Sequence, residues 1–296
     1  MARRVHPVMI LAAERKLADL ISPPTPDGVL EASGVIARGA HYYVVFDNVR
    51  RIAGIHRSLD PASKRHSWLG RKRDGEGYED IAFSRFTRRF YMLIEAQKHP
   101  DGTYKAAIDE YDESPRYKRR QWIDVAFEKR NRGFEGLSAV RWRGQDCLLV
   151  LCEGNRCRAG RAGRKPGGGR IHLLQRSGAL WKPVARIKLP ESVTFEDYSA
   201  MSLRGRRLAV LSQQSSQLWI GTIRFDDWSI ADKGHTYEFP RTKNGKIEYA
   251  TLEGLCWLTD RSFVCVSDVA KPPCKKRHRK KDQSLHVFEL PLEGST

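Results

Sequence analysis

Short runs of apolar residues alternate with charged or glycine-containing segments along the whole 296-residue chain. Runs such as YYVVF, FYMLIEA and CLLVLC are only a few residues long and rich in β-branched, aromatic and leucine side chains, which is typical of β-strands. Connectors such as RGAH and RGQD between consecutive runs predict hairpin turns. No segment carries a long apolar stripe with the helical period, so the pattern predicts an all-β protein with little helix.

One short phrase recurs five times: a bulky apolar residue, a glutamate, and then small or acidic positions. It occurs as LEASG, YEDIA, FEGLS, FEDYS and LEGLC, at intervals of about 50 to 60 residues. Its glutamates are Glu31, Glu79, Glu135, Glu196 and Glu253. Self-similarity at this period is typical of propeller blades or of a solenoid.

A second phrase follows each first one at a regular distance of about 15 to 18 residues. It is an apolar run that ends in an acid or its amide, and the residues are Asp47, Glu95, Glu153, Gln213 and Asp268. Each unit therefore contains three or four antiparallel strands. Units of this kind, repeated five times, predict a β-propeller, because radial repetition leaves only short sheet edges exposed.

We expect a single propeller domain over residues 1–296, with blades that start near residues 30, 78, 134, 195 and 252. Five blades are the main prediction, and six remain open if the first 30 residues hold another unit. The segment after Glu253 is too short for a full blade. The run HPVMILA, within residues 1–20, is predicted to supply the missing outer strand and close the ring.

The blade sequences YEDIAFSRFTRRFYMLIEAQ, FEGLSAVRWRGQDCLLVLCEGN and LEGLCWLTDRSFVCVSDVA resemble those of phytase-like β-propellers, the esterase-like-activity-of-phytase and SdiA-regulated groups of bacterial proteins. As a pattern, the resemblance covers nearly the whole chain. It implies the propeller fold and, at the level of the family, a hydrolase. It supports the fold more strongly than the function, because propellers host many unrelated activities.

The chain is strongly basic, with 53 Lys and Arg against 35 Asp and Glu and a formal charge of +18. This balance favours polyanions, phosphorylated molecules or acidic membranes as partners. No apolar run approaches the roughly 18 residues of a membrane-spanning helix, and the N-terminal run is a poor signal peptide. We therefore expect a cytoplasmic protein without a membrane span, whose six cysteines do not form a disulfide framework.

The two phrases place acidic side chains at one end of a blade, because entry to the first strand and exit from the second lie on the same face. Like charges at close range must protonate, pair with cations, accept N–H bonds or hold a metal. Oxygen ligands suit Ca²⁺, Mg²⁺ or Mn²⁺. Architectural roles for the first-phrase glutamates remain the alternative. The candidate metal ligands are Asp47, Glu95, Glu135, Glu153, Glu253 and Asp268.

Proton transfer at this mouth is assigned to Glu95, Glu153 and His99, since His99 follows Glu95 closely. Two basic loops, 154–170 and 269–283, leave the same face and can bind phosphate, although such loops can also be merely solvated. The candidate anion-binding residues are Arg156, Arg158, Arg161, Lys275, Lys276 and Arg277. A zinc site from Cys152, Cys157, Cys274 and His278 has poor spacing.

Three functions remain open on this evidence. The first is a metal-assisted hydrolase that acts on a phosphorylated or nucleotide-like substrate at the mouth of the central channel. The second is a non-catalytic propeller that binds nucleic acid or another polyanion with salt-dependent affinity. The third is a protein-interaction scaffold without a small-molecule site.

Overall fold

A computed structural model describes residues 6–70, 75, 77–130 and 133–292, and nearly all of its regular structure is β. Strands that follow one another within a unit pair antiparallel. The first sheet consists of β2 (Ala32–Arg38), β3 (His41–Phe46), β4 (Ile52–His56) and β5 (Ser67–Leu69). The third consists of β14 (Ala200–Arg204), β15 (Arg207–Ser212), β16 (Gln217–Arg224), β17 (Ser229–Ile230) and β18 (His235–Glu238).

The second sheet has eight strands because two four-stranded meanders join at their outer edges. The junction is a short parallel pairing of β13 with β9, in which Leu180 lies opposite Trp122. The first meander consists of β6 (Asp80–Ser84), β7 (Arg89–Lys98), β8 (Tyr104–Asp112) and β9 (Tyr117–Phe127). The second consists of β10 (Phe134–Trp142), β11 (Gln145–Cys152), β12 (Arg170–Ser177) and β13 (Leu180–Lys188).

The last sheet combines both ends of the chain. It contains β19 (Leu252–Trp257), β20 (Ser262–Ser267), β21 (Ser284–Glu289) and, on its outer edge, β1 (Ile10–Lys16). β1 pairs antiparallel with β21, from Ile10 opposite Glu289 to Lys16 opposite Ser284. The helices of the described residues are single turns in connections: α1 (Leu17–Leu20), η1 (Asn155–Cys157), α2 (Gly160–Gly163) and α3 (Lys276–Arg279).

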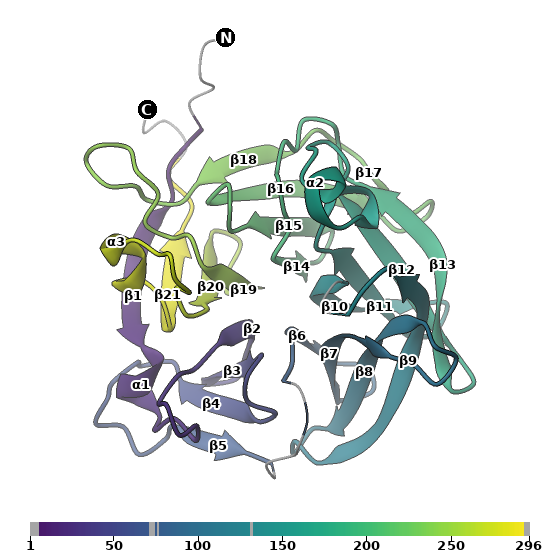
Figure 1. Cartoon of the computed structure of the whole chain (residues 1–296), viewed down its shortest axis with the longest axis horizontal. Helices are drawn as coiled ribbons and strands as arrows, with labels where there is room; N and C mark the ends of the chain where they lie inside the picture. The colour runs from purple at the N-terminus through teal and green to yellow at the C-terminus, as the bar shows by residue number, and fades with distance from the viewer. Residues whose placement is uncertain (1–5, 71–74, 76, 131–132, 293–296) are drawn as a thin grey trace.

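The sheets are arranged around a central axis (Figure 1). The first strand of each unit lies nearest the axis, and we call β2, β6, β10, β14 and β19 the inner strands. Each inner strand contacts the next, and β19 contacts β2, so the contacts run once around the ring. This confirms the prediction of an all-β, propeller-like arrangement in which the repeated phrase leads into the strand at the channel.

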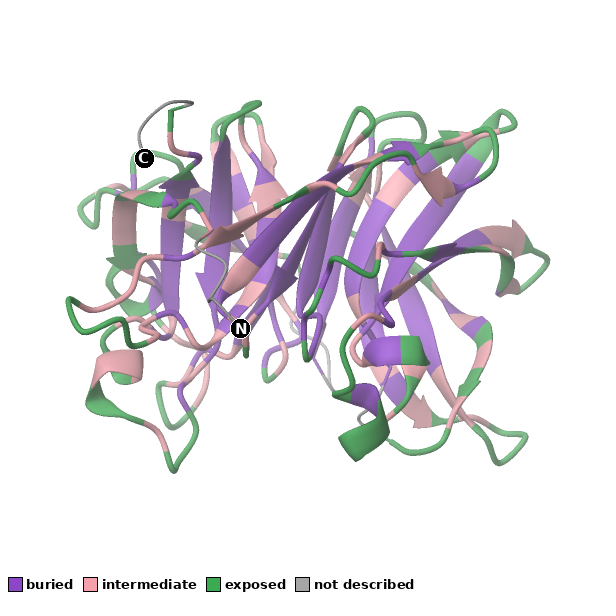
Figure 2. Ribbon diagram, turned by 90° about the horizontal axis from the view of Figure 1, so that it is seen from above, coloured by how far each residue is buried: buried purple, intermediate pink, exposed green. Residues whose placement is uncertain are grey.

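The core lies between neighbouring sheets, where apolar faces pack against each other. Leu149 of β11 and Val210 of β15 belong to one such layer, and Phe46 of β3 and Val264 of β20 belong to another. Figure 2 shows the buried strand interiors, with the exposed positions concentrated in the loops at the ends of the strands. The alternating apolar runs of the sequence are therefore strands that are covered on both faces.

Close contact between inner strands explains the glycine in the phrase Glu-Gly-Leu. A Cβ at Gly136 would lie 2.9 Å from the backbone N of Met201 on the next inner strand. At Gly254 it would lie 3.0 Å from the Cα of Gly34, and at Gly34 it would lie 2.7 Å from the Cα of Asp80. These positions exclude any side chain because the backbones of neighbouring units meet there.

Candidate functional sites at the two mouths of the ring

The pairing of the first two strands of each unit shows which residues are equivalent in the five units. Gly34, Asp80, Gly136, Ala200 and Gly254 each pair with the residue two positions before the acid or amide of the second phrase. The residues directly before them, which occupy equivalent positions at the start of the inner strands, are Ser33, Glu79, Glu135, Ser199 and Glu253. The predicted repeat is therefore in register at three glutamates only.

Glu31 and Glu196 lie two and three residues before the equivalent position, and this corrects the prediction that five glutamates enter the channel mouth alike. Glu196 is exposed, and Glu31 is only partly buried. The equivalent serines join neighbouring units instead. Ser33 Oγ donates to the carbonyl of Tyr78, and Ser199 Oγ donates to the carbonyl of Leu252 at 3.0 Å. The sequence pattern missed them because a tolerant phrase matched a nearby glutamate.

Glu79, Glu135 and Glu253 share one electrostatic environment. Burial raises the pKa of each well above its usual value, and neighbouring carboxylates raise it further. For Glu135, the neighbouring charges are those of Glu79, Glu153, Glu95 and Glu253. We call the cluster at this end of the ring the acidic mouth, and its members are Asp47, Glu79, Glu95, Glu135, Glu153, Glu253 and Asp268.

A lysine that the sequence reasoning passed over lies at the edge of this cluster. Lys271 Nζ is 2.9 Å from Glu31 Oε2 and 3.5 Å from Asp268 Oδ2. Burial raises the pKa of Asp268 to about 7, although Lys271 and the N–H of Val269 oppose the rise. Burial and the Glu31 charge raise the pKa of Asp47, which Lys271 also opposes. Lys271 thus offsets part of the negative charge at this edge.

Asp197 is a second acid that the sequence reasoning missed. Burial raises its pKa to about 6, against the effect of hydrogen bonds from Ser212 Oγ at 2.5 Å and from the N–H of Gln214. The charges of Glu153 and Glu196 add to the rise. The phrase FEDYS contains both Glu196 and Asp197, and the sequence pattern selected the exposed Glu196 in place of the buried Asp197.

The carboxylates of the acidic mouth interact through space without forming a compact ligand set. Within the described ranges, the one group of three His, Cys, Asp or Glu ligand atoms within 4.8 Å of one another is Cys152, Cys157 and His172. A hard cation at the acidic mouth would therefore be held by one or two carboxylates and by water. This donor set is the one that Mg²⁺ commonly accepts.

The cysteines differ from the prediction. Cys152 and Cys157 form a disulfide that closes the start of the first basic loop. This bond also removes both sulfurs from the suggested zinc site, whose other members have protein partners: Arg279 Nε donates to Cys274 Sγ, and His278 Nε2 lies 3.2 Å from the carbonyl of Ile247. The spacing of two cysteines in one loop did not distinguish a disulfide from core packing.

The loop after Glu153 is folded around one buried amide. Asn155 Nδ2 donates to the carbonyls of Gly163 at 2.9 Å and Phe195 at 3.1 Å. Its Oδ1 accepts from the N–H of Gly168 at 2.8 Å and from the hydroxyl of Tyr198 at 2.9 Å. The exposed residues that this scaffold presents include the predicted anion-binding side chains Arg156, Arg158 and Arg161.

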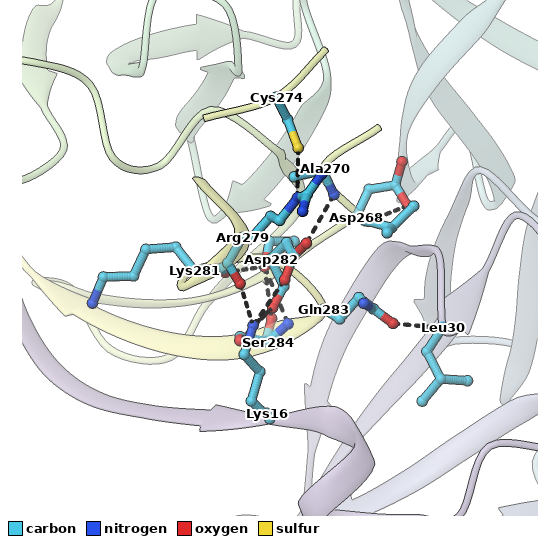
Figure 3. A network of polar contacts seen from close by, with 12 residues as sticks. Lys16, Leu30, Asp268, Ala270, Cys274, Arg279, Lys281, Asp282, Gln283 and Ser284 are labelled. Carbon is cyan, nitrogen blue, oxygen red and sulfur yellow. Dashed lines mark hydrogen bonds and ion pairs between the residues drawn. The ribbon is translucent and has the colours of Figure 1, made fainter. Parts of the chain in front are cut away.

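The loop after Asp268 is held by a buried carboxylate, Asp282 (Figure 3). Lys16 Nζ lies 2.8 Å from Asp282 Oδ1, and the N–H of Ala270 donates to Asp282 Oδ2 at 3.0 Å. Lys16 also donates to the carbonyl of Arg279 at 3.0 Å. Lys275 and Lys276 are exposed, whereas Arg277 Nε donates to the carbonyl of Ile247 at 2.6 Å and is partly engaged.

His99 belongs to the hairpin turn between β7 and β8. Its Nδ1 lies 2.9 Å from Asp101 Oδ1, and its ring packs edge-on against Trp122 with the centroids 5.0 Å apart. These contacts hold the imidazole against its own turn and against β9 of the same meander. The charges of Glu95 and Glu153, by contrast, raise the pKa of Glu135.

The opposite mouth of the ring contains a cavity of about 1010 Å³. It is lined by the far ends of all five inner strands and by the turns that follow them, and none of the acidic-mouth residues belongs to its lining. Its lining includes six arginines and a single acid, Glu113. We call it the arginine cavity, and its arginines are Arg38, Arg57, Arg85, Arg88, Arg141 and Arg204. The sequence analysis did not predict it.

No protein-family model and no curated protein matches the chain. Among solved structures, the glutaminyl cyclase of Myxococcus xanthus is similar over 98% of this chain and 100% of its own, with a TM-score of 0.58 and 12% identity. A β-xylosidase, RS223, is similar over 95% of this chain and 96% of its own, with a TM-score of 0.53 and 11% identity. These likenesses support the propeller-like fold alone, and no phytase-like family is among them.

No helix in the described part of the chain is long and apolar enough to cross a membrane. This agrees with the prediction from the sequence. The cytoplasmic location stays a prediction, and the disulfide is an argument against it, because cytosolic proteins rarely keep such bonds.

Proposed function

We propose that this protein is a five-bladed propeller hydrolase, closed by β1, that uses a divalent cation at the acidic mouth to act on a phosphorylated or nucleotide-like substrate. The observation that carries the proposal is the crowding of Glu79, Glu135 and Glu253 with the second-phrase acids, because burial and these neighbouring charges raise the pKa of all three glutamates. Such crowding is costly unless protons or a cation compensate it. Catalytic sites are common where pKa values are perturbed in this way.

The cation is assigned to the acids that face one another at this mouth, and Ca²⁺, Mg²⁺ and Mn²⁺ are the candidates. When bound, it would polarise a phosphoryl oxygen and offset the charge that develops on it. One or two of six predicted acids would hold the ion together with water, and these acids are Asp47, Glu95, Glu135, Glu153, Glu253 and Asp268.

The chain itself supplies the remaining functions of the site. Lys271 and the exposed arginines of the first basic loop would neutralise the outer phosphate oxygens, which favours a substrate with more than one negative charge. Glu153 lies beside Glu135 and at the start of that loop, so it is placed to accept a proton from an attacking water. Glu95 and His99 are the further candidates for proton transfer.

The resemblance of the blade sequences to phytase-like propellers agrees with a phosphoester as the bond that is cleaved. It gives no particular substrate, and the basic loops accommodate nucleotide-like compounds as readily as sugar phosphates. A screen should therefore include phosphomonoesters, phosphodiesters and nucleotides.

The decisive experiment joins metal binding to activity. We expect isothermal titration of the chelator-treated protein with Ca²⁺, Mg²⁺ and Mn²⁺ to show binding by at least one ion, and the screen to show activity that EDTA abolishes. Glu135→Gln should weaken that binding and lower kcat about 100-fold or more, since one ligand charge is lost. Glu196→Gln is the matched control, because this exposed glutamate belongs to the same sequence phrase but lies outside the cluster.

Hydrolysis that survives EDTA, or an equal effect of both substitutions, would contradict the proposal. The second candidate function, a non-catalytic module for nucleic acid or another polyanion, would then take its place. The exposed Arg156, Arg158, Arg161, Lys275 and Lys276 favour it. It predicts binding to single-stranded DNA that weakens steeply between 50 and 200 mM salt, as counterion release requires, and that ignores the chelator.

A further inference from the structure

We propose that the arginine cavity is a separate binding site for a small anionic molecule with an apolar body, such as an aromatic or aliphatic carboxylate or phosphate ester. The cavity is large enough for such a ligand, since drug-sized ligands occupy pockets of about 300 to 1,000 Å³. Its walls come from the five inner strands, which belong to four sheets. The space is therefore built by the fold itself and not by one mobile loop.

The deeper wall of the cavity is apolar. The side chains of Ile81, Leu137, Met201 and Leu255 belong to its lining and are almost fully buried in the protein, and Trp257 lies beside them. The small polar side chains of the lining are Ser84, Ser138 and Ser202. Two of them already have partners, since Ser84 Oγ donates to Asp146 Oδ1 at 2.6 Å and Ser202 Oγ accepts the N–H of Trp257 at 3.2 Å. This wall favours a hydrocarbon or ring over a polar sugar, because burial of unpaired hydroxyls costs free energy.

The charge of the lining selects an anion. Glu113 is shared by Arg38 and Arg88, and Arg204 Nε pairs with Asp260 Oδ1 at 2.7 Å. The remaining arginines of the lining have no carboxylate partner among the residues that the structure describes, and they are Arg57, Arg85 and Arg141. A carboxylate or phosphate at this rim would meet guanidinium groups that are not yet neutralised.

Two of these arginines are held by aromatic rings. The guanidinium carbon of Arg141 lies 3.8 Å from the centroid of Phe86, and that of Arg57 lies 5.5 Å from the centroid of Tyr42. A ring holds the plane of the guanidinium and leaves its N–H edge available to an anion. Such positioning reduces the entropy that a flexible side chain loses when it binds.

A small molecule fits this site better than a polymer. The lining ends at Ile81, Leu137 and Leu255, two residues after the three glutamates of the acidic mouth. A ligand therefore enters from the arginine side and meets negative charge at the far end of the ring. This geometry favours an anionic head at the rim and an uncharged body that points inward.

The test uses a matched pair of fluorescent probes. 1-Anilinonaphthalene-8-sulfonate carries an anionic head, and N-phenyl-1-naphthylamine has the same ring system without it. We expect the native protein to bind one sulfonate probe per chain, and to bind it at least 10-fold more tightly than the neutral probe. The double variant Arg57→Gln/Arg141→Gln should weaken binding of the sulfonate probe about 10-fold or more, because two charge-assisted contacts are lost.

Arg224→Gln is the matched control, since Arg224 is half-exposed on β16, pairs with Asp227 and lies outside the cavity lining. Displacement of the probe by octanoate or by hexyl phosphate then distinguishes a carboxylate from a phosphate head. Equal affinity for both probes, or equal loss in the control variant, would overturn the proposal. The readout is independent of the hydrolase, because EDTA and Glu135→Gln should leave binding of the sulfonate probe unchanged.

Discussion

The two mouths of the ring are built from the same five inner strands, yet they have opposite chemistry. At the acidic mouth, acids at the start of the inner strands meet acids at the end of the second strands, burial and neighbouring charges raise the pKa of Glu135, and Lys271 offsets part of the charge. At the other mouth, arginines outnumber acids around an open cavity. The net charge of +18 is therefore distributed unevenly. All five inner strands run in the same direction. Residues at the start of each inner strand therefore lie at the acidic mouth, and residues at its end lie at the arginine cavity.

The largest expected effect concerns the close contact between neighbouring inner strands at Gly34, which lies between the acidic mouth and the arginine cavity. Gly34→Ala places a Cβ 2.7 Å from the Cα of Asp80, so the inner strands must move apart. We expect the free energy of unfolding to fall by about 3 kcal/mol, as for overpacked cores. Urea denaturation followed by tryptophan fluorescence measures this change.

Gly133→Ala is the control, because its Cβ would lie no closer than 3.6 Å to any neighbour. If both substitutions cost the same, the inner strands are not tightly packed at Gly34. Close packing of the inner strands would then not be what keeps the acidic mouth apart from the arginine cavity.

The second effect concerns the Cys152–Cys157 disulfide, which lies beside the acidic mouth. The described residues contain no disulfide at the arginine cavity. Loss of the Cys152–Cys157 bond in Cys157→Ser should lower the free energy of unfolding by about 2 kcal/mol, the value for closing a short loop. Hydrogen exchange should rise in the loop after Glu153 and not in the loop after Asp268.

Cys274→Ser tests the other basic loop, whose order depends on Asp282 and not on a disulfide. We expect its stability to change by less than about 0.5 kcal/mol. Equal sensitivity of the two variants to added dithiothreitol would show that the bond does not form in solution.

A third, smaller effect comes from the raised pKa of Glu135. The folded protein binds this proton more tightly than the unfolded chain does, so the carboxylate destabilises the fold as the pH rises above the unfolded pKa of about 4.3. In EDTA, Glu135→Gln should therefore raise the free energy of unfolding by about 1 kcal/mol at pH 8 and change it little at pH 4. Denaturation curves at the two pH values measure the difference.

Glu196→Gln should show no such pH-dependent gain, because Glu196 is exposed. If Glu135→Gln lowers the free energy of unfolding at pH 8, the Glu135 carboxylate has a stabilising partner in the folded protein. The glutamates of the acidic mouth would then have a structural role, which is the alternative given in the sequence analysis.

The smallest effect belongs to the rim of the arginine cavity. Asp260→Asn removes the partner of Arg204, but both side chains are substantially exposed. Such pairs contribute about 0.5 kcal/mol or less, so the melting temperature should hardly change. Affinity for the sulfonate probe should rise, since one more guanidinium becomes available. A lower affinity would show that Asp260 orients Arg204 for the ligand.

The sequence by itself determined the all-β class, the inner position of the repeated phrase and the gathering of second-phrase acids at one mouth. These features follow from apolar periodicity and from strand direction, which are local and repeated. Glu79, Glu135 and Glu253 were placed correctly because each directly precedes the residue that packs against a neighbouring unit. The run HPVMILA was predicted to be an outer strand because the last unit lacked one, whereas the strand that pairs with β21 lies slightly later, at Ile10–Lys16.

Only the tertiary structure decided which glutamates are equivalent, which cysteines pair and where the cavity lies. The shift from Glu31 to Ser33 and from Glu196 to Ser199 depends on pairing register, which a tolerant sequence phrase does not resolve. The arginine cavity gathers turns from five units that are far apart in the chain. Lining arginines recur in four of these turns, as in RGAH, RFTRRF, RWRGQD and RGRR, but the sequence does not show that they surround one opening. Its chemistry arises from closure of the ring, which brings isolated arginines around one opening.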